Sequence, residues 1–252
     1  VPGARTAAFH DAYVADAAHP EGYRGEVLVS YPDLVRHIDK SEKLGMGLKI
    51  HCTGDYAVTE MLDAVEAIRH FNGPTDIKHH IAHASYIRDE DVSRFGPLGV
   101  VADLCPMIWY PTTFLEGHKE AMGEERATRF WPIASLKATG ALLAGGSDWP
   151  VIPIPDPWNG IEGMVTRQNP SGAFPGVSLW AEQAIDLASA IEIYTLNSAK
   201  AMRIDEETGS LAVGKSADII VLDQNVFEVP ADRIADTKVL TTYFSGQAVY
   251  QR

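Results

Sequence analysis

The sequence predicts an α/β fold built around a parallel sheet. Three short apolar runs each end in a polar residue, at His51, His83 and Asp148. Each run has the length and composition of a strand, and segments of helical periodicity separate them. Strand and helix in alternation indicate parallel pairing through right-handed crossovers. Because the active site of a parallel α/β barrel lies at the carboxyl ends of its strands, we expect the three polar side chains to converge.

The first elements follow an irregular opening. Residues 32–43 predict a helix, because their apolar residues recur at helical spacing. A strand over residues 46–51 ends at the first histidine. Residues 55–71 then predict a strongly amphipathic helix, and Asn-Gly-Pro at 72–74 ends it.

The middle of the chain continues this alternation. Residues 77–83 predict a strand, and a short helix opens with the acidic residues at 89–91. Residues 99–105 predict the next strand. The connection over residues 106–123 is longer than an ordinary loop of this kind, so it is either a lid or disordered. Its aromatic residues favour a lid.

The last predicted elements lie on either side of a change of composition near Asp205. Residues 124–139 predict a helix, residues 141–148 a strand, and a proline-rich loop leads to a helix over about 179–202. The remaining sequence is rich in β-formers. We therefore divide the chain into an α/β part over 1–204 and a small β-domain over 205–252.

Composition narrows the class of protein. The 252 residues are 46% hydrophobic and 22% charged, as in ordinary globular proteins, and the net charge is -13. Nucleic acid and anionic membrane surfaces repel such a charge, so we expect neither as a partner and expect a small-molecule substrate. No apolar run reaches the roughly 20 residues of a membrane helix. Cys52 and Cys105 are expected to be buried free thiols rather than a disulfide, which fits the cytoplasm.

His51, His83 and Asp148 are the candidate site residues. Two imidazoles and one carboxylate suit a divalent metal that activates water, and so predict a hydrolase. The competing interpretation makes each histidine a core residue bonded to a backbone carbonyl, and Asp148 a loop cap. His79 and His80 lie close enough to His83 to exchange roles with it, although we expect His79 to be structural.

Other polar and aromatic residues have weaker functional interpretations. Asp55 is expected to cap a helix or to orient His51 from behind. Gly214-Lys215-Ser216 resembles the end of a phosphate loop but lacks its glycine spacing, so it predicts a turn. Four aromatic residues could line a substrate pocket or pack in the core with equal prior: Trp109, Tyr110, Phe114 and Trp149.

Four motifs occur in a consistent order and spacing along the chain. They are His51-Cys-Thr-Gly-Asp55, Ile81-Ala-His83-Ala84, Gly146-Ser-Asp148-Trp-Pro150, and Asn197-Ser-Ala199 followed by Gly209 to Asp218. Through them the sequence resembles the amidohydrolase superfamily, and within it the amidohydrolase 3 (YtcJ-like) branch. The resemblance runs nearly end to end.

The resemblance implies a fold and a chemistry. The fold is the second half of a TIM-type (β/α)8 metal-dependent hydrolase barrel, with part of a small C-terminal β-sandwich domain. His51, His83 and Asp148 become ligands of a divalent metal, with Zn²⁺ the expected ion and one or two ions in the complete enzyme. Asp148 is also the catalytic residue, which moves a proton from water to the leaving amine. The implied reaction is hydrolysis of a C–N bond in a non-peptide amide, formamide or cyclic amide.

The sequence also departs from the family pattern. No His-x-His pair occurs, although the family's first strand supplies one, so we expect strands five to eight only. Ala82 and Tyr56 replace a common Glu and Arg. The rival hypothesis is therefore a non-catalytic truncated fragment that lacks the N-terminal ligands. Such a fragment could pair with a missing N-terminal half or form a homo-oligomer. A small-molecule binding protein explains the three strand-end residues less well.

Overall fold

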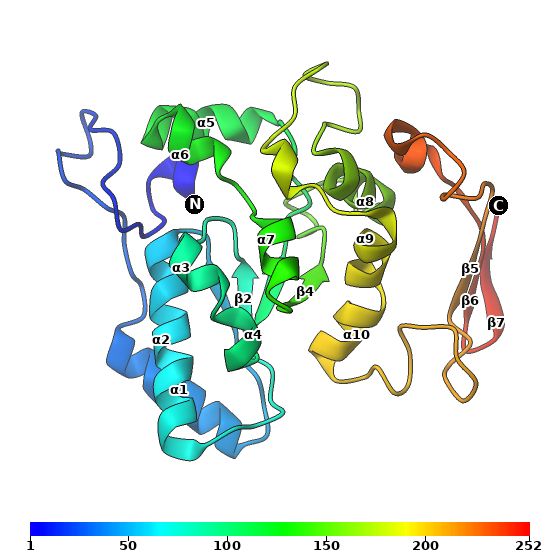
Figure 1. The fold of residues 1–252 in the computed structure, drawn as a ribbon, viewed down its shortest axis with the longest axis horizontal. Helices are drawn as coiled ribbons and strands as arrows, with labels where there is room; N and C mark the ends of the chain where they lie inside the picture. The colour runs from blue at the N-terminus through cyan, green and yellow to red at the C-terminus, as the bar shows by residue number, and fades with distance from the viewer.

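A four-stranded parallel sheet forms the centre of the computed structural model, which describes residues 1–252 (Figure 1). Its strands, in spatial order, are β1 (Lys49–Cys52), β2 (His80–His83), β3 (Val101–Leu104) and β4 (Leu142–Gly145). All three strand pairs are parallel. The predicted α/β class is confirmed, and every predicted strand exists, although each is shorter than its apolar run.

Two long helices flank β1 in the sequence, as predicted. Helix α1 (Tyr31–Lys43) begins at Ser30, whose side chain accepts a hydrogen bond from the Asp33 amide. Helix α2 (Asp55–Asn72) buries one apolar stripe and ends at Gly73, whose φ of 83° favours glycine. The two helices pack against each other.

The other helical segments are short, and several were not predicted. They are η1 (Pro2–Ala4), α3 (Asp89–Val92), α4 (Phe95–Leu98), α5 (Thr113–Met122), α6 (Glu124–Thr128), α7 (Ile133–Ala138), α8 (Pro157–Thr166), η2 (Ala181–Gln183), α9 (Leu187–Tyr194), α10 (Leu196–Met202) and η3 (Ala231–Asp236).

The connection over residues 106–123 is neither an open lid nor disordered. Helix α5 occupies the second half of this connection. In the first half, Trp109 and Tyr110 are buried in the hydrophobic core. The Trp109 indole donates a hydrogen bond to the carbonyl of Gly160, 2.9 Å away. The prediction was wrong because it treated these aromatic residues as loop residues, whereas they fill the space between the sheet and α8.

The helix predicted over 124–139 is broken in two. Between α6 and α7 the backbone turns at Trp131, which has a φ of 55°, and Pro132 follows directly. Proline removes a backbone donor, and a left-handed residue cannot continue a helix. The helix predicted over 179–202 is likewise divided, at Thr195, which has a φ of -121° and a ψ of -94°.

The proline-rich loop contains a helix that the sequence did not predict. Helix α8 begins after Asp156, whose carboxylate accepts from the Trp158 amide, and Pro157 occupies its first turn. Proline is well tolerated there, because the first amides of a helix have no intrahelical partner. The helix was not predicted because several other prolines surround Asp156 and Pro157, the residues that begin it.

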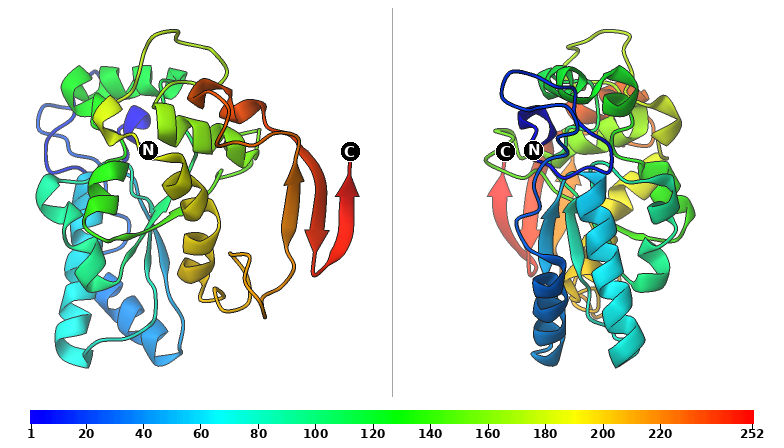
Figure 2. Two further views of the ribbon diagram at one scale, coloured as in Figure 1. Left: turned by 45° about the vertical axis from the view of Figure 1, so that its right-hand side comes forward. Right: turned by 90° about the vertical axis from the view of Figure 1, so that its left-hand side faces the viewer.

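The C-terminal segment forms a separate three-stranded antiparallel sheet. Its strands are β5 (Ile219–Leu222), β6 (Val239–Phe244) and β7 (Gln247–Gln251), in that order. In Figure 2 this sheet stands beside α9 and α10, at the opposite end of the molecule from α1 and α2. The structure thus contains one sheet here and not a two-sheet sandwich; every residue of β7 is exposed.

The central sheet has two different faces. The helix face carries Cys52, Ile81, Leu104 and other apolar residues, which join a core of 43 buried residues that includes the apolar stripe of α2. The opposite face, here called the inner face, carries Lys49, His51, His80, Ala82, Val101, Asp103, Leu142 and Ala144. Ala201 of α10 packs on this inner face against Val101 and Ala144.

Cys52 and Cys105 are buried and free, as predicted. No helix of the structure combines the length and the apolar character needed to cross a membrane.

His118 of α5 lies in a buried aromatic cluster. Its Nδ1 is 2.9 Å from the Tyr86 hydroxyl, and that hydroxyl donates its hydrogen to the carbonyl of Ala127. Burial, and secondarily the nearby N-terminal ammonium, lowers the pKa of His118 to about 4. The neutral ring is therefore the form that the fold accommodates.

We predict that the free energy of unfolding of His118→Phe decreases less in mild acid than that of the wild type. In the native protein the free energy of unfolding should fall between pH 6.5 and about 4, because only the unfolded chain takes up this proton there. The pKa difference corresponds to a loss of about 3 kcal/mol. Urea unfolding across this pH range measures it, with the exposed His37→Phe as matched control. Equal acid sensitivity in wild type and His118→Phe would contradict the assignment.

Candidate metal centre

His51 and His83 meet at the carboxyl end of the sheet. His51 Nδ1 and His83 Nε2 are 2.8 Å apart, and the ring planes cross at 74°. The rings come from neighbouring strands, β1 and β2, and from positions 32 residues apart in the chain. His51 is exposed on the outermost strand, whereas His83 is 9% exposed. The predicted convergence of these two imidazoles is present in the structure.

Strand alternation alone would point His83 toward the helix face, where Ile81 lies. His83 ends β2 with a φ of 73°, and Ala84 follows with a φ of 47°. This left-handed turn redirects the His83 ring to the inner face, where His51 lies. The site therefore depends on a local backbone conformation that residues with a Cβ adopt at an energetic cost.

A backbone carbonyl fixes the orientation of the His83 ring. His83 Nδ1 donates to the carbonyl of Cys105, 2.7 Å away, so Nε2 carries the free lone pair. Such a bond on the far nitrogen is the usual support of a metal-binding imidazole. Nε2 accepts the hydrogen bond from His51 Nδ1 in this structure.

The electrostatics favour the neutral form of His51, which is the form that binds metals. Burial lowers the pKa of His51, the adjacent His83 lowers it further, and Asp148 opposes both effects. The two nitrogens that face each other are closer than two ligands of one zinc ion, which stand about 3.4 Å apart for Zn–N bonds near 2.1 Å in a tetrahedral site. The pair thus has the donor chemistry of a metal site in a contracted, hydrogen-bonded arrangement.

Asp148 lies near this pair but does not complete it. It follows β4 with a φ of 57° and is half-buried. Its negative charge favours protonation of His51, Lys49 and Cys105. No group of three or more His, Cys, Asp or Glu side chains in the structure is arranged to hold a metal ion. The three-ligand set therefore stays a prediction.

A charged network lies on the inner face. Asp103 is level with His51 in the strand register, and Lys49 and His80 lie one row below. Asp103 Oδ2 is 2.8 Å from Lys49 Nζ and 3.2 Å from His80 Nδ1. The other nitrogen of His80 lies 3.1 Å from the carbonyl of Ala201. Burial raises the pKa of the Asp103 carboxyl, but the hydrogen bonds from His80 and Lys49 outweigh it, and the net shift is downward.

Lys49 and Asp103 were not among the residues predicted from the sequence. The available signal was their spacing, because Lys49 stands two residues before His51 and therefore shares its face. A charged residue inside an apolar strand needs a partner, and Asp103 is the only acidic residue in the strand over residues 99–105.

Of the two residues with predicted supporting roles, His79 has the predicted one and Asp55 has another. His79 is fully buried on the helix side, where it accepts from the Leu48 amide and contacts Glu42 at 2.9 Å, so its structural role is confirmed. Asp55 neither caps a helix nor orients His51. Its carboxylate accepts from the backbone amide of His10, which ties the N-terminal segment to α2.

The four aromatic residues for which pocket lining and core packing were equal alternatives do not line a common pocket. Trp109 and Tyr110 are buried in the core, whereas Phe114 is 52% and Trp149 65% exposed. These residues lie in different surroundings, so the core-packing interpretation is correct for the first two.

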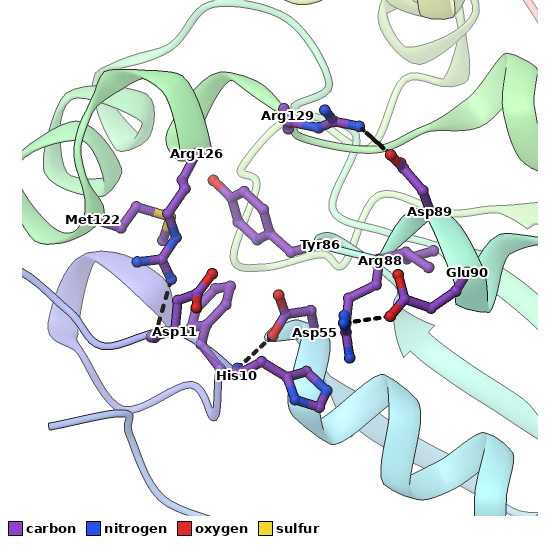
Figure 3. Close-up of a pocket in the computed structure, with 12 residues that line it drawn as sticks. His10, Asp11, Asp55, Tyr86, Arg88, Asp89, Glu90, Met122, Arg126 and Arg129 are labelled. Carbon is purple, nitrogen blue, oxygen red and sulfur yellow. Dashed lines mark hydrogen bonds and ion pairs between the residues drawn. The ribbon is translucent and has the colours of Figure 1, made fainter. Parts of the chain in front are cut away.

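A polar pocket of about 270 Å³ lies beside the segments that follow β1 and β2 (Figure 3). Asp55 and Tyr86 form its floor, and Arg126 reaches into it from α6. Arg126 donates to the carbonyls of Asp11 and Ala12, so its charge serves mainly to anchor the N-terminal segment. The pocket contains neither histidine of the pair.

A second cavity, of about 520 Å³, opens at the free edge of β1. His51, Lys49 and Glu60 line it together with the extended segment around Leu28. Leu28 is 90% exposed. The exposed side of the histidine pair therefore faces an open apolar space and not the protein core.

The model of the amidohydrolase family matches residues 1–250. The chain belongs to this family. The branch assigned from the motifs is confirmed, since a putative amidohydrolase, YtcJ, of Bacillus subtilis is 28% identical over 99% of the chain and 45% of its own length.

Other relatives support the same family. The protein LONG AFTER FAR-RED 3 of Arabidopsis thaliana is 30% identical over 98% of the chain and 41% of its own length. An N-substituted formamide deformylase of Arthrobacter pascens is 28% identical over 84% of the chain and 38% of its own length. The chain thus spans less than half the length of these curated relatives.

A solved structure has the same fold. An uncharacterized metal-dependent hydrolase from Pyrococcus horikoshii superposes with a TM-score of 0.75 at 28% identity, over 92% of the chain and 44% of that protein. The amidohydrolase fold is therefore shown for the α/β part, and metal-dependent hydrolases are its structural neighbours.

We predict that Asp103→Asn destabilises the chain by about 1 to 2 kcal/mol, because two charge-assisted hydrogen bonds to a buried carboxylate are weakened. Urea unfolding at neutral pH measures the change. Asp89→Asn is the matched control, since the Asp89–Arg129 pair is exposed and should contribute much less. Equal effects of the two substitutions would show that the inner-face network is only a surface contact.

Proposed function

We propose that this chain supplies the second half of a metal-dependent amidohydrolase site, with His51, His83 and Asp148 as ligands of one divalent ion. The observation that carries the proposal is the His51–His83 pair, 2.8 Å apart and supported from behind by the Cys105 carbonyl. Neutral imidazole nitrogens and a nearby carboxylate suit zinc.

The bound metal would supply Lewis acidity and lower the pKa of a water molecule to about 7. The side chains of the chain have separate tasks. His83 keeps Nδ1 protonated through the bond to Cys105 and presents Nε2, while His51 presents a ring that is already biased to its neutral form. His51 is therefore ready to bind a cation without first losing a charge.

Asp148 has the role of proton carrier. Asp148 is half-buried near the start of the loop between β4 and α8, and its negative charge acts on His51. It would accept the proton of the attacking water at Oδ and return it to the leaving nitrogen. Proton transfer by a positioned carboxylate contributes typically 10²–10⁴-fold to a rate.

The proposed substrate class is a non-peptide amide, formamide or cyclic amide. The formamide deformylase among the relatives supports cleavage of a C–N bond. The proposed partner is a polypeptide that completes the barrel at the free edge of β1, where His51 faces the 520 Å³ cavity. We keep the cytoplasm as the proposed location, because both buried thiols are unpaired.

The second candidate is a non-catalytic fragment of such an enzyme. The absence of a three-ligand group favours it for the isolated chain. Metal analysis separates the two, since a stoichiometric metal retained through gel filtration supports the enzyme and an empty chain supports the fragment.

We predict that Asp148→Asn abolishes hydrolysis of N-substituted formamides in the chain combined with the N-terminal half of a family member. Loss should exceed about 10²-fold, because Asn cannot accept the proton. Circular dichroism checks that the fold is intact. Asp156→Asn, in the same loop, is the matched control, since asparagine also caps a helix well. Substantial turnover by Asp148→Asn would refute the role.

A further inference from the structure

Trp131 lies directly behind the metal-ligand candidate His83. Its indole Nε1 donates to the carbonyl of His83 at 2.6 Å, and its backbone amide donates to the carbonyl of Ser85 at 2.8 Å. Trp131 is fully buried. One residue therefore holds the chain on both sides of Ala84.

These two hydrogen bonds stabilise a segment whose backbone conformation is energetically unfavourable. His83 and Ala84 are consecutive residues in the left-handed region, and neither is glycine. Such conformations persist only where the surroundings determine them. The side chain of His83 reaches the inner face only in this conformation, so the bonds from Trp131 help to determine where its Nε2 points.

Trp131 is itself firmly placed. The buried Arg167 donates through Nη2 to the carbonyl of Phe130 at 2.8 Å, and the Phe130 ring stacks on Tyr86 at 4.9 Å. The Nη1 atom of Arg167 has no hydrogen-bond partner. The visible role of Arg167 is to bind backbone carbonyls, of which one belongs to the residue before Trp131.

We propose that Trp131 is a positioning residue, whose indole N–H clamps the His83 carbonyl and so directs the His83 imidazole toward the metal. The proposal rests on the proposed function in one respect, namely that His83 is a ligand. The clamp itself is a property of the metal-free chain.

The first test uses Trp131→Phe, which removes the N–H group and keeps an aromatic ring. Trp109→Phe is the matched control, because Trp109 is equally buried, packs against Trp131 and donates its indole N–H to a carbonyl, that of Gly160. Nitrogen NMR of the histidine rings at alkaline pH should show His83 protonated at Nδ1 in wild type and in Trp109→Phe. Trp131→Phe should give a mixture of tautomers, as the ring leaves Cys105.

The second test is zinc affinity, measured by competition with a chelator. Trp131→Phe should bind Zn²⁺ about 10- to 100-fold more weakly than wild type, the usual effect of removing a supporting contact. Adding Ala84→Gly should restore much of the affinity, because glycine adopts the left-handed conformation without the clamp. Lost packing alone would not be rescued in this way.

A measurement on wild type covers the case in which Trp131→Phe does not fold. By linkage, zinc should slow hydrogen exchange of the Trp131 indole by the same factor that the clamp adds to zinc affinity, and leave the Trp109 indole unchanged. An unprotected Trp131 indole, or an unchanged His83 tautomer in Trp131→Phe, would overturn the proposal. Failure of wild type to bind zinc, with the tautomer shift present, would instead overturn the proposed function and leave the clamp standing.

Discussion

The alternation of side chains along the central strands is the constraint on which this structure depends. Apolar residues on one face fix the strands against α2 and its neighbours, and the register then determines every residue of the inner face. Lys49, His80 and Asp103 meet because the packing of Ile81 and Leu104 leaves them no other direction. The chemistry of the inner face is thus a consequence of the core on the other side.

Much of the fold could be predicted from the sequence, because its strands and long helices are periodic. The four strands, α1 and α2 were all identified. The break at Trp131 was missed although Pro132 marks it, because a proline inside a helical pattern ends the helix before it. The break at Thr195 has no such marker in the sequence. Helix α8 was missed because prolines that begin a helix and prolines that prevent one look alike in a sequence.

The candidate site shows the same division. The motifs identified His51, His83 and Asp148, and the structure brings the first two together. It also shows that His83 arrives there against the alternation of β2, through a left-handed turn that no residue type announces. Asp55 was misassigned because a sequence cannot show that the N-terminal segment folds back onto α2. Long-range contacts of this kind have no local signal.

The position of His51 on the outermost strand has a mechanical consequence. A short edge strand is free to fray, and β1 has a neighbour on one side only. Any ligand bound by both His51 and His83 would cross-link β1 to β2. Ligand binding and fraying of β1 are then thermodynamically linked. A protease that cleaves only the frayed strand would therefore cut more slowly when the ligand is bound.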